Sequence, residues 1–313
     1  MNIKESSYIE KQAISIENDY LKAIVLPNEG SNLISLYDKV KGIELLRTPK
    51  TKQEFQSRRM VFGNPILFPP NRIEDAEFTF DNRLYKFPMN KPTENNHSHG
   101  VLHNKKWNVI ERNKNKMLIT TQLVSNTIDE LNSIFPQSFV VELTFQLLDH
   151  CLFQSLSIKN NSSFKLPVLL GLHTNFYFSN KNSLLQMEVG KQWTFNERNL
   201  PTGERVNWPN QYHLKSGLLI KSSFDHEFEM SKSKTAIINH RHLGIQLEYE
   251  AIKGFNFWAL FNGDGKQNYL AIEPYTCITN APNLDMPHQL TGLEWIEPND
   301  QKSYRTSITV KHT

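Results

Sequence analysis

Two side chains able to carry protons interrupt the most apolar parts of the chain. His173 follows the apolar residues 166–172, and Glu273 follows an apolar run and precedes Pro274. Burial keeps an imidazole neutral near pH 7 and raises the pKa of a carboxyl group, which suits both groups for general acid-base catalysis. Each also has a structural interpretation: His173 as a hydrogen-bonded core residue, and Glu273 as half of a salt bridge. Because proline cannot donate to a neighbouring strand, we expect the strand to end at Glu273 and to leave its carboxylate at the opening of a cleft.

A stiff loop and a turn present further polar groups. Pro69 and Pro70 exclude a central strand, so they predict a rigid loop that presents Asn71 and Arg72. A guanidinium in such a place can donate hydrogen bonds to ligand hydroxyls, although a structural salt bridge is the commoner role of arginine. Asp225 opens a short Asp-His-Glu-Phe element that, taken alone, cannot be told from a charged turn.

Three histidines lie close together in residues 97–103. In an extended chain His97 and His99 point to the same face, which would suit a metal-binding pair. A convincing third ligand is lacking, because His103 lies beyond Gly100. Gly100 lets the backbone turn and lets a ligand approach closely. We therefore expect His99 to act as a hydrogen-bond donor to a ligand, with ordinary surface histidines as the alternative.

Short alternating segments must position these groups. Apolar and polar residues alternate over residues 20–26, 116–123, 139–147 and 152–158, a period of two that predicts strands. The best helical candidate, residues 126–134, is short, and the chain has no glycine-rich phosphate loop and no dinucleotide motif. Because there is no linker, composition break or repeat, we expect residues 1–313 to form a single all-β domain, built as a large sandwich.

The charge balance and the cysteine content exclude several classes of protein. Lys and Arg number 35 against 32 Asp and Glu, a net charge of +3 without a run of like charges, so nucleic acid is not the expected partner. Cys151 and Cys277 are far apart and form no Cys-x-x-Cys motif, which excludes a disulfide scaffold and a zinc ribbon. No long apolar segment follows the first residues or could span a membrane. We expect a reduced, cytoplasmic protein that does not bind membranes.

Taken in order, these segments resemble the aldose 1-epimerase family, also called galactose mutarotases. The family pattern is an arginine after a proline-rich loop, a His-Gly pair followed by a tryptophan, a second histidine after an apolar strand, an Asp-His-x-aromatic element, and a Glu-Pro-aromatic element followed by asparagine. The chain carries this pattern as Pro69-Pro70-Asn71-Arg72, His99-Gly100 with Trp107, His173, Asp225-His226-Glu227-Phe228, and Glu273-Pro274-Tyr275 with Asn280-Ala281-Pro282-Asn283. The resemblance covers nearly the whole chain, and the order and spacing of all five elements make it specific.

The resemblance implies a fold and a set of site residues. The fold is a large antiparallel β-sandwich, a supersandwich of the galactose mutarotase-like kind, with a cleft across one sheet and with no metal or other cofactor. By position in the pattern, Glu273 corresponds to the general base and His173 to the general acid. The resemblance implies that the groups holding the oxygens of the sugar are Arg72, His99 and Asp225, with Asn71 in the same substrate-binding set.

The chain departs from many members of the family next to two of these groups. It has Glu74-Asp75-Ala76 after the arginine loop and Val101 after the His-Gly pair, where glycines are common in the family. The sequence therefore does not determine the shape of the cleft rim or the substrate preference. Aromatic side chains that could offer an apolar face to a sugar are Trp107, Trp258 and Tyr275, although core packing is the commoner role.

The residue types suit the interconversion of the α and β anomers of a small aldose. One group removes the proton of the C1 hydroxyl while another protonates the ring oxygen; the ring opens, and after rotation about C1–C2 the reverse transfers close it. The alternatives are a carbohydrate-binding or sensing protein, an epimerase of a sugar phosphate, which would need extra Arg or Lys at the cleft, and a glycoside hydrolase that uses Asp225 and Glu273. The sequence leaves the preferred aldose open and fits a monomer or a homodimer.

Overall fold

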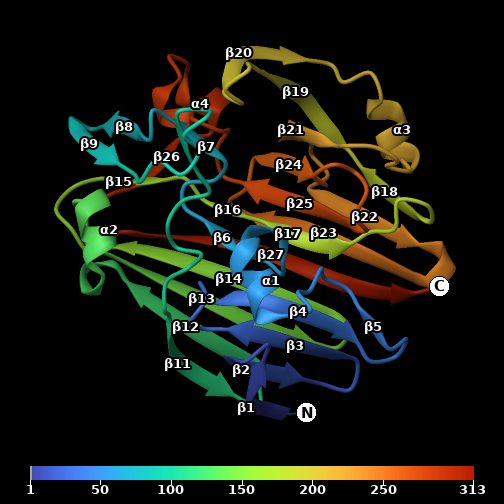
Figure 1. Ribbon diagram of the computed structural model, residues 1–313. Helices are drawn as coiled ribbons and strands as arrows, with labels where there is room; N and C mark the ends of the chain where they lie inside the picture. The colour runs from blue at the N-terminus through green and yellow to red at the C-terminus, as the bar shows by residue number, and fades with distance from the viewer. Residues whose placement is uncertain (1) are drawn as a thin grey trace.

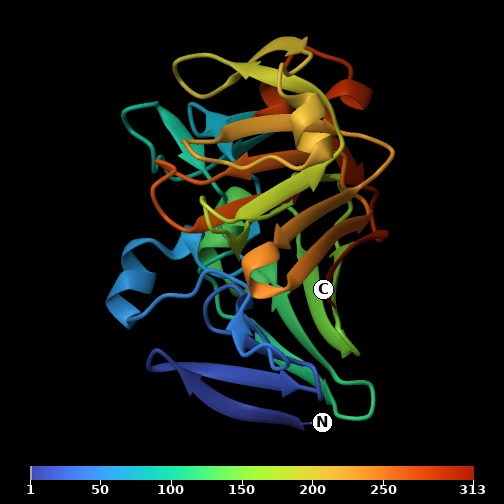
Figure 2. The same cartoon turned by 90° about the vertical axis from the view of Figure 1, so that its right-hand side faces the viewer.

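The computed structural model describes residues 2–313 and consists mainly of antiparallel strands (Figure 1). The first five strands form a meander, called here the N-terminal sheet: β1 (Asn2–Tyr8), β2 (Lys11–Glu17), β3 (Leu21–Leu26), β4 (Asn32–Asp38) and β5 (Ile43–Glu44). This sheet lies at one end of the molecule, at the bottom of Figures 1 and 2.

Two eight-stranded sheets form the rest of the body. In spatial order, the β14 sheet contains β11 (Asn108–Asn113), β12 (Leu118–Val124), β13 (Phe139–Leu148), β14 (Cys151–Asn160), β27 (Gln301–His312), β23 (Ile245–Lys253), β22 (Thr235–His240) and β18 (Ser183–Met187). The β25 sheet contains β20 (Pro201–Val206), β19 (Val189–Phe195), β21 (Asp225–Met230), β24 (Phe257–Phe261), β25 (Tyr269–Tyr275), β16 (Gly171–Leu172) and β6 (Ile66–Leu67), with β17 (Thr174–Tyr177) also paired to β25. The predicted all-β class is confirmed.

Short elements connect these sheets. The two-stranded pairs are β7 (Arg72–Glu74) with β10 (Asn96–Ser98), β8 (Glu77–Phe80) with β9 (Arg83–Lys86), and β15 (Leu166–Val168) with β26 (Glu294–Ile296). The α-helices are α1 (Lys52–Ser57), α2 (Asp129–Ile134), α3 (Gln211–Ser216) and α4 (His288–Thr291), and the 3-10 turns are η1 (Arg59–Val61), η2 (Ser125–Thr127), η3 (Arg241–Leu243) and η4 (Ala281–Asn283). The helical prediction for residues 126–134 thus corresponds to part of η2 followed by α2.

The period-two pattern of the sequence builds the β14 sheet. In β13 and β14 buried residues alternate with half-buried ones, as expected for strands that present one face to the core. The four segments predicted as strands correspond to β3, β12, β13 and β14. The two large sheets meet through Tyr249 of β23, whose ring lies 5.2 Å from that of Phe176 on β17 and 6.0 Å from that of Trp258 on β24.

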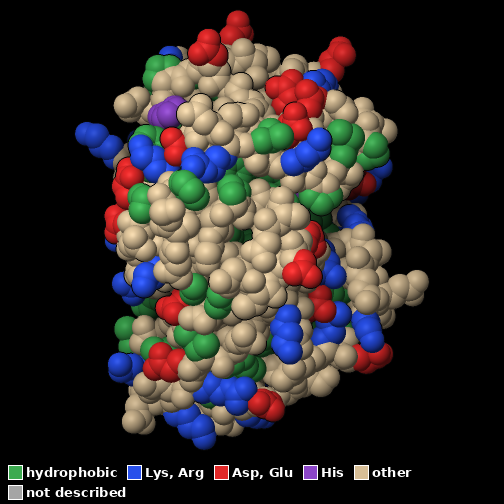
Figure 3. All heavy atoms as spheres, turned by 90° about the vertical axis from the view of Figure 1, so that its left-hand side faces the viewer, with side chains coloured by type: hydrophobic (Ala, Val, Ile, Leu, Met, Phe, Trp, Pro, Cys, Tyr) green, Lys and Arg blue, Asp and Glu red, His purple; other side chains and the backbone are tan. Residues whose placement is uncertain are grey.

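Charged side chains of both signs are interspersed over the surface. Figure 3 shows this mixture on one face of the molecule, where Lys and Arg alternate with Asp and Glu. A nucleic-acid-binding face would instead gather its basic residues into a patch or stripe. Among residues 2–313, no helix is long and apolar enough to cross a membrane.

Candidate active site

The register of the β25 sheet aligns acidic side chains on one face. Glu227 of β21 pairs with Ala259 of β24, and Ala259 pairs in turn with Glu273 of β25. Asp225 precedes Glu227 by two residues, so the two point to the same side of β21. Because residues opposite one another on neighbouring strands share a face, the sheet brings together carboxyl groups that are far apart in the sequence.

The same register places His173 beside Glu273. On the other side of β25, β16 and β17 pair with it in the same register, with a break between Gly171 and Thr174, and this register puts His173 opposite Glu273. The backbone N–H of His173 points away from β25 and donates to the carbonyl of Pro65 at 2.9 Å, which continues the register between β16 and β6. The imidazole Nε2 lies 3.3 Å from the Glu273 carboxylate oxygen Oε1, and each side chain is only 3% exposed.

The expectation that the strand ends at Glu273 is wrong, because β25 continues through Pro274 to Tyr275. The carbonyl of Tyr275 accepts a hydrogen bond from the N–H of Asn256, on the side of β24. Successive residues of a strand bond to opposite neighbours, so the backbone of Pro274 faces the other neighbour, formed by β16 and β17. That neighbour is the edge where β16 and β17 are interrupted. The missing N–H of Pro274 therefore breaks no pairing with β24, and the proline is tolerated inside the strand.

Burial acts in opposite directions on the two members of the His173–Glu273 pair. It lowers the pKa of the His173 imidazole to about 4 and raises the pKa of the Glu273 carboxyl well above its usual value. A hydrogen bond from the hydroxyl of Tyr275 to Glu273 Oε2, 2.6 Å long, stabilises the carboxylate and partly offsets the effect of burial. Both shifts favour the neutral form of each group, with a proton on Glu273 and none on His173.

Arg72 is held in place by two neighbours. Its Nε and Nη2 atoms donate to the two carboxylate oxygens of Glu94, at 2.9 and 3.3 Å, and its Nη1 atom donates to the amide oxygen of Asn71 at 2.8 Å. Both predicted roles of Arg72 are therefore compatible with the structure: its guanidinium forms a salt bridge, and it also lines the cavity described below, where it could contact a ligand.

Asn71 links Arg72 to a buried carboxyl group. The amide nitrogen of Asn71 donates to Glu227 Oε1 at 2.9 Å, and the hydroxyl of Thr279 donates to the same oxygen at 2.6 Å. Burial raises the pKa of Glu227 to about 7, against the effect of these hydrogen bonds. Asp225 lies more openly at the edge of the site, but the surrounding protein still raises the pKa of its carboxyl.

His99 enters the site because the backbone turns at that residue. His99 and Gly100 both have left-handed backbone angles, with φ of 65° and 67°. An added Cβ at Gly100 would lie 2.1 Å from the carbonyl oxygen of Phe68, so only glycine fits there. The ring of His99 lies 5.4 Å from that of His173, and burial lowers its pKa well below the usual value.

The assumption of an extended chain at His97 and His99 is wrong. The left-handed turn at His99 breaks the alternation, and His97 Nδ1 instead lies 2.6 Å from the carbonyl oxygen of Pro88 while its ring packs near Phe87. Within residues 2–313, no group of three or more His, Cys, Asp or Glu side chains is arranged to hold a metal ion.

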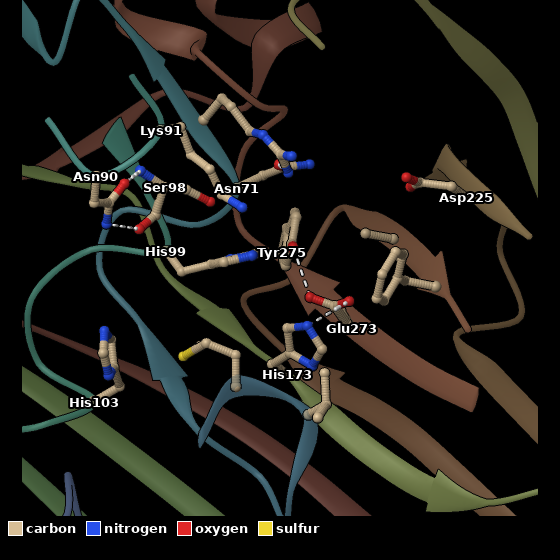
Figure 4. Close-up of a pocket in the computed structure, with 15 residues that line it drawn as sticks. Asn71, Asn90, Lys91, Ser98, His99, His103, His173, Asp225, Glu273 and Tyr275 are labelled. Atoms are coloured by element: carbon tan, nitrogen blue, oxygen red, sulfur yellow. Dashed lines mark hydrogen bonds and ion pairs between the residues drawn. The ribbon is translucent and has the colours of Figure 1, made fainter. Parts of the chain in front are cut away.

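These side chains surround a cavity of about 380 Å³ (Figure 4). All six residues singled out from the sequence line it: Asn71, Arg72, His99, His173, Asp225 and Glu273. In Figure 4, His99, Tyr275, Glu273 and His173 converge on one side of the cavity, and Asp225 lies across the open space from Asn71. A polar ligand held there would lie among the Glu273–His173 pair, an arginine and a further carboxyl group.

Sequence reasoning missed several lining residues. Met60, Val61, Asn90, Lys91, Ser98, Ala259 and Phe261 also line the cavity, mostly from loops and from residues without a distinctive local pattern. His103, which the sequence suggested only as a weak metal ligand, lines it too. Asn90 and Ser98 hold each other through two hydrogen bonds, of 2.7 and 2.9 Å, between the Asn90 amide and the Ser98 backbone. Of the three aromatic candidates, Tyr275 lines the cavity, whereas Trp107 and Trp258 are fully buried in the core.

Comparisons with known proteins identify the family and the fold. The sequence model of the aldose 1-epimerase family matches residues 12–309. A galactose mutarotase-like protein from Clostridium acetobutylicum is 28% identical, with a TM-score of 0.93 over 99% of this chain and 98% of that chain. Galactose 1-epimerase from Lactobacillus acidophilus is 14% identical, with a TM-score of 0.77 over 99% and 98% of the two chains, and a galactose mutarotase-like protein from Lactobacillus casei is 17% identical, with a TM-score of 0.76 over 96% and 100%. The fold is therefore galactose mutarotase-like, as the resemblance implied.

Proposed function

The chain belongs to the aldose 1-epimerase family, and on that premise we propose that it interconverts the α and β anomers of a neutral aldose. The observation that carries the proposal is the contact of 3.3 Å between Glu273 Oε1 and His173 Nε2 at the wall of the cavity. An acid and a base at that spacing can both reach one sugar ring, because the C1 hydroxyl and the ring oxygen are attached to the same carbon.

Each half-reaction moves two protons. The Glu273 carboxylate takes the proton of the C1 hydroxyl while the His173 imidazolium gives its proton to the ring oxygen, and the bond between C1 and that oxygen breaks. The open-chain aldehyde rotates about C1–C2. Protonated Glu273 then returns its proton to the aldehyde oxygen as neutral His173 removes the proton from the attacking hydroxyl, so the ring closes on the other face and both groups regain their starting states.

The starting ion pair forms from the proton that the pair already holds. Burial favours the neutral arrangement, with the proton on Glu273 and none on His173. We infer that the proton passes to the imidazole when the two groups, 3.3 Å apart, close to hydrogen-bond distance; the hydrogen bond from Tyr275 favours the carboxylate that is left. The pair is active as long as it holds one proton, which supports activity across neutral pH.

The other walls suit hydroxyl groups. Arg72 and His99 can donate hydrogen bonds, Asp225 can accept them, and Asn71 can do either, which is the mixture that a polyhydroxylated ligand requires. A phosphate is less well matched. Of the two cations that line the cavity, Arg72 is already paired with Glu94, so Lys91 alone would offset the phosphate charge, and Asp225 adds a further negative charge to the lining.

Polarimetry of freshly dissolved sugars tests this proposal. We expect the protein to accelerate the change in optical rotation of at least one of glucose, galactose and a panel of further aldoses, and a hexose phosphate should compete weakly. No acceleration for any sugar, together with binding detected by calorimetry, would favour a carbohydrate-binding protein. Strong competition by the hexose phosphate would favour a sugar phosphate as the substrate.

A further inference from the structure

Arg198 lies in the turn between β19 and β20, outside the cavity. It is not among the residues that line the cavity, and its side chain is 36% exposed. The guanidinium nevertheless donates hydrogen bonds to two other segments, the turn after β7 and the loop before β10. In Figures 1 and 2 the β19–β20 hairpin and β7 lie at the same end of the molecule, opposite the N-terminal sheet. Arg198 therefore joins three segments that are far apart in the sequence.

Two ion pairs hold the turn after β7. Arg198 Nη1 lies 3.0 Å from Glu74 Oε1, and Nη2 lies 2.7 Å from Asp75 Oδ1. These two acidic residues belong to the rim whose shape the sequence does not determine. Asp75 has a left-handed backbone, with φ of 51°, a conformation that residues other than glycine adopt at an energetic cost. Isolated ion pairs on a surface contribute little, but several that converge on one guanidinium form a network that can hold such a turn in place.

The same guanidinium fixes the main chain of the loop before β10. Its Nε atom donates to the backbone carbonyl of Glu94 at 3.0 Å, and its Nη2 atom donates to the backbone carbonyl of Asn95 at 3.0 Å. In return, the amide nitrogen of Asn96 donates to the backbone carbonyl of Arg198 at 2.8 Å. The anchored main chain includes Glu94, whose carboxylate holds Arg72.

This loop positions both cations that line the cavity. Glu94 fixes Arg72 through its side chain, and Lys91 is joined to Asn96 by two backbone hydrogen bonds of 3.0 and 3.1 Å. A shift of the main chain at residues 94–96 would therefore disturb Arg72 and Lys91 together. A guanidinium that is already held in one orientation loses less conformational entropy when a sugar hydroxyl binds to it, which strengthens binding.

We infer that Arg198 is a positioning residue, which sets the affinity for the sugar from outside the cavity by holding Glu94 and, through it, Arg72. This rests on the function proposed above. The hydrogen bonds of the Arg198 side chain all go to the rim segments and none goes to Glu273 or His173. Loss of Arg198 should therefore weaken sugar binding and leave the proton transfers largely intact.

Kinetics of two variants provide the first test. In polarimetry Arg198→Ala should raise KM for the preferred aldose about tenfold while kcat changes less than about twofold. Arg198→Lys keeps the charge but cannot reach the carboxylates and the backbone carbonyls at once, so it should resemble Arg198→Ala. Arg205→Ala is the matched control, because Arg205 lies in the same hairpin and pairs with Glu229 at 2.8 Å, away from the rim. A wild-type KM in folded Arg198→Ala, or an equal increase in Arg205→Ala, would overturn the inference.

A double variant separates positioning from general destabilisation. If Arg198 acts through Arg72, then Arg198→Ala combined with Arg72→Lys should have a KM about tenfold above that of the wild type, no higher than Arg72→Lys alone, because both substitutions remove the same hold on the sugar. A KM about a hundredfold above that of the wild type, the product of two independent effects, would contradict an action through Arg72.

Amide hydrogen exchange tests the clamp without any sugar. In Arg198→Ala the amides of residues 94–96 should exchange at least about tenfold faster than in the wild type, whereas Arg205→Ala should leave them unchanged. Unchanged exchange in Arg198→Ala would overturn the inference, whatever the protein does to sugars. If the wild type accelerates anomerisation of no aldose, the proposed function fails separately, and the exchange rates still decide whether Arg198 holds this loop.

Discussion

Replacing Tyr275 by Phe should make the carboxylate form of Glu273 rarer without disturbing the fold. The hydroxyl of Tyr275 donates to Glu273 Oε2 at 2.6 Å inside the protein, while its ring is 1% exposed and packs over Gly171. A hydrogen bond to a charged group contributes about 1.5–3 kcal/mol, and 1.36 kcal/mol corresponds to one pKa unit, so its loss should raise the pKa of Glu273 by about 1–2 units. The carboxylate form of the pair then becomes about 10- to 100-fold rarer, and kcat should fall by the same factor.

The pH profile of anomerisation separates this effect from simple destabilisation. In Tyr275→Phe the alkaline limb should move upward with the pKa of Glu273, while the acid limb, which is set by His173 with its pKa of about 4, should stay in place. Tyr85→Phe is the matched control, because it also removes a buried phenol, which accepts a 2.5 Å hydrogen bond from Gln137 away from the cavity. A folded Tyr275→Phe protein with the kcat and pH profile of the wild type would show that the hydroxyl of Tyr275 does not control the ionisation of Glu273.

Three further substitutions test separate parts of the structure. Burial raises the pKa of Glu44 from 4.5 to about 7, so this group contributes stability that is fully present below pH 4.5 and is lost as the pH rises through about 7. In urea titrations, Glu44→Gln should therefore reduce the loss of unfolding free energy between pH 5 and 8 by up to about 3 kcal/mol. An unchanged pH dependence would contradict this. Gly171→Ala would place a Cβ 2.6 Å from the ring of Tyr275 and should cost about 1–3 kcal/mol of unfolding free energy. It should also lower kcat, because the displaced ring carries the hydroxyl that bonds Glu273. Wild-type stability and kcat would show that the ring moves freely. Arg72→Lys cannot keep the two-pronged contact with Glu94, so KM should rise about tenfold while kcat changes less than about twofold; a selective loss of kcat would instead place Arg72 at the reacting atoms.

The sequence was most informative where structure depends on local pattern. Alternation of apolar and polar residues identified β12, β13 and β14 because each presents one face to the core. Reactive residues inside apolar runs were equally visible, because a buried histidine or glutamate needs a partner. His173 and Glu273 were singled out for that reason, and the structure shows that they are each other's partner.

The sequence was least informative where neighbouring strands decide the outcome. Pro274 lies within β25 because its missing N–H faces the break in pairing between Gly171 and Thr174, and nothing near Pro274 in the sequence indicates that break. His99 adopts a left-handed backbone, which the following glycine suggested only in part. Residues such as Lys91 reach the cavity from loops whose positions depend on the packing of the whole fold, so no local pattern could place them.

The anomerisation rate of the Glu273→Gln variant is the measurement that most directly tests the proposed acid-base pair. Glutamine preserves the size of the side chain but can no longer accept the C1 proton, so the rate measured by polarimetry should fall about 10²- to 10⁴-fold while the sugar still binds in calorimetry. A rate equal to that of the wild-type protein would show that the proton leaves the C1 hydroxyl by another route, and the pairing of Glu273 with His173 would have no part in the chemistry.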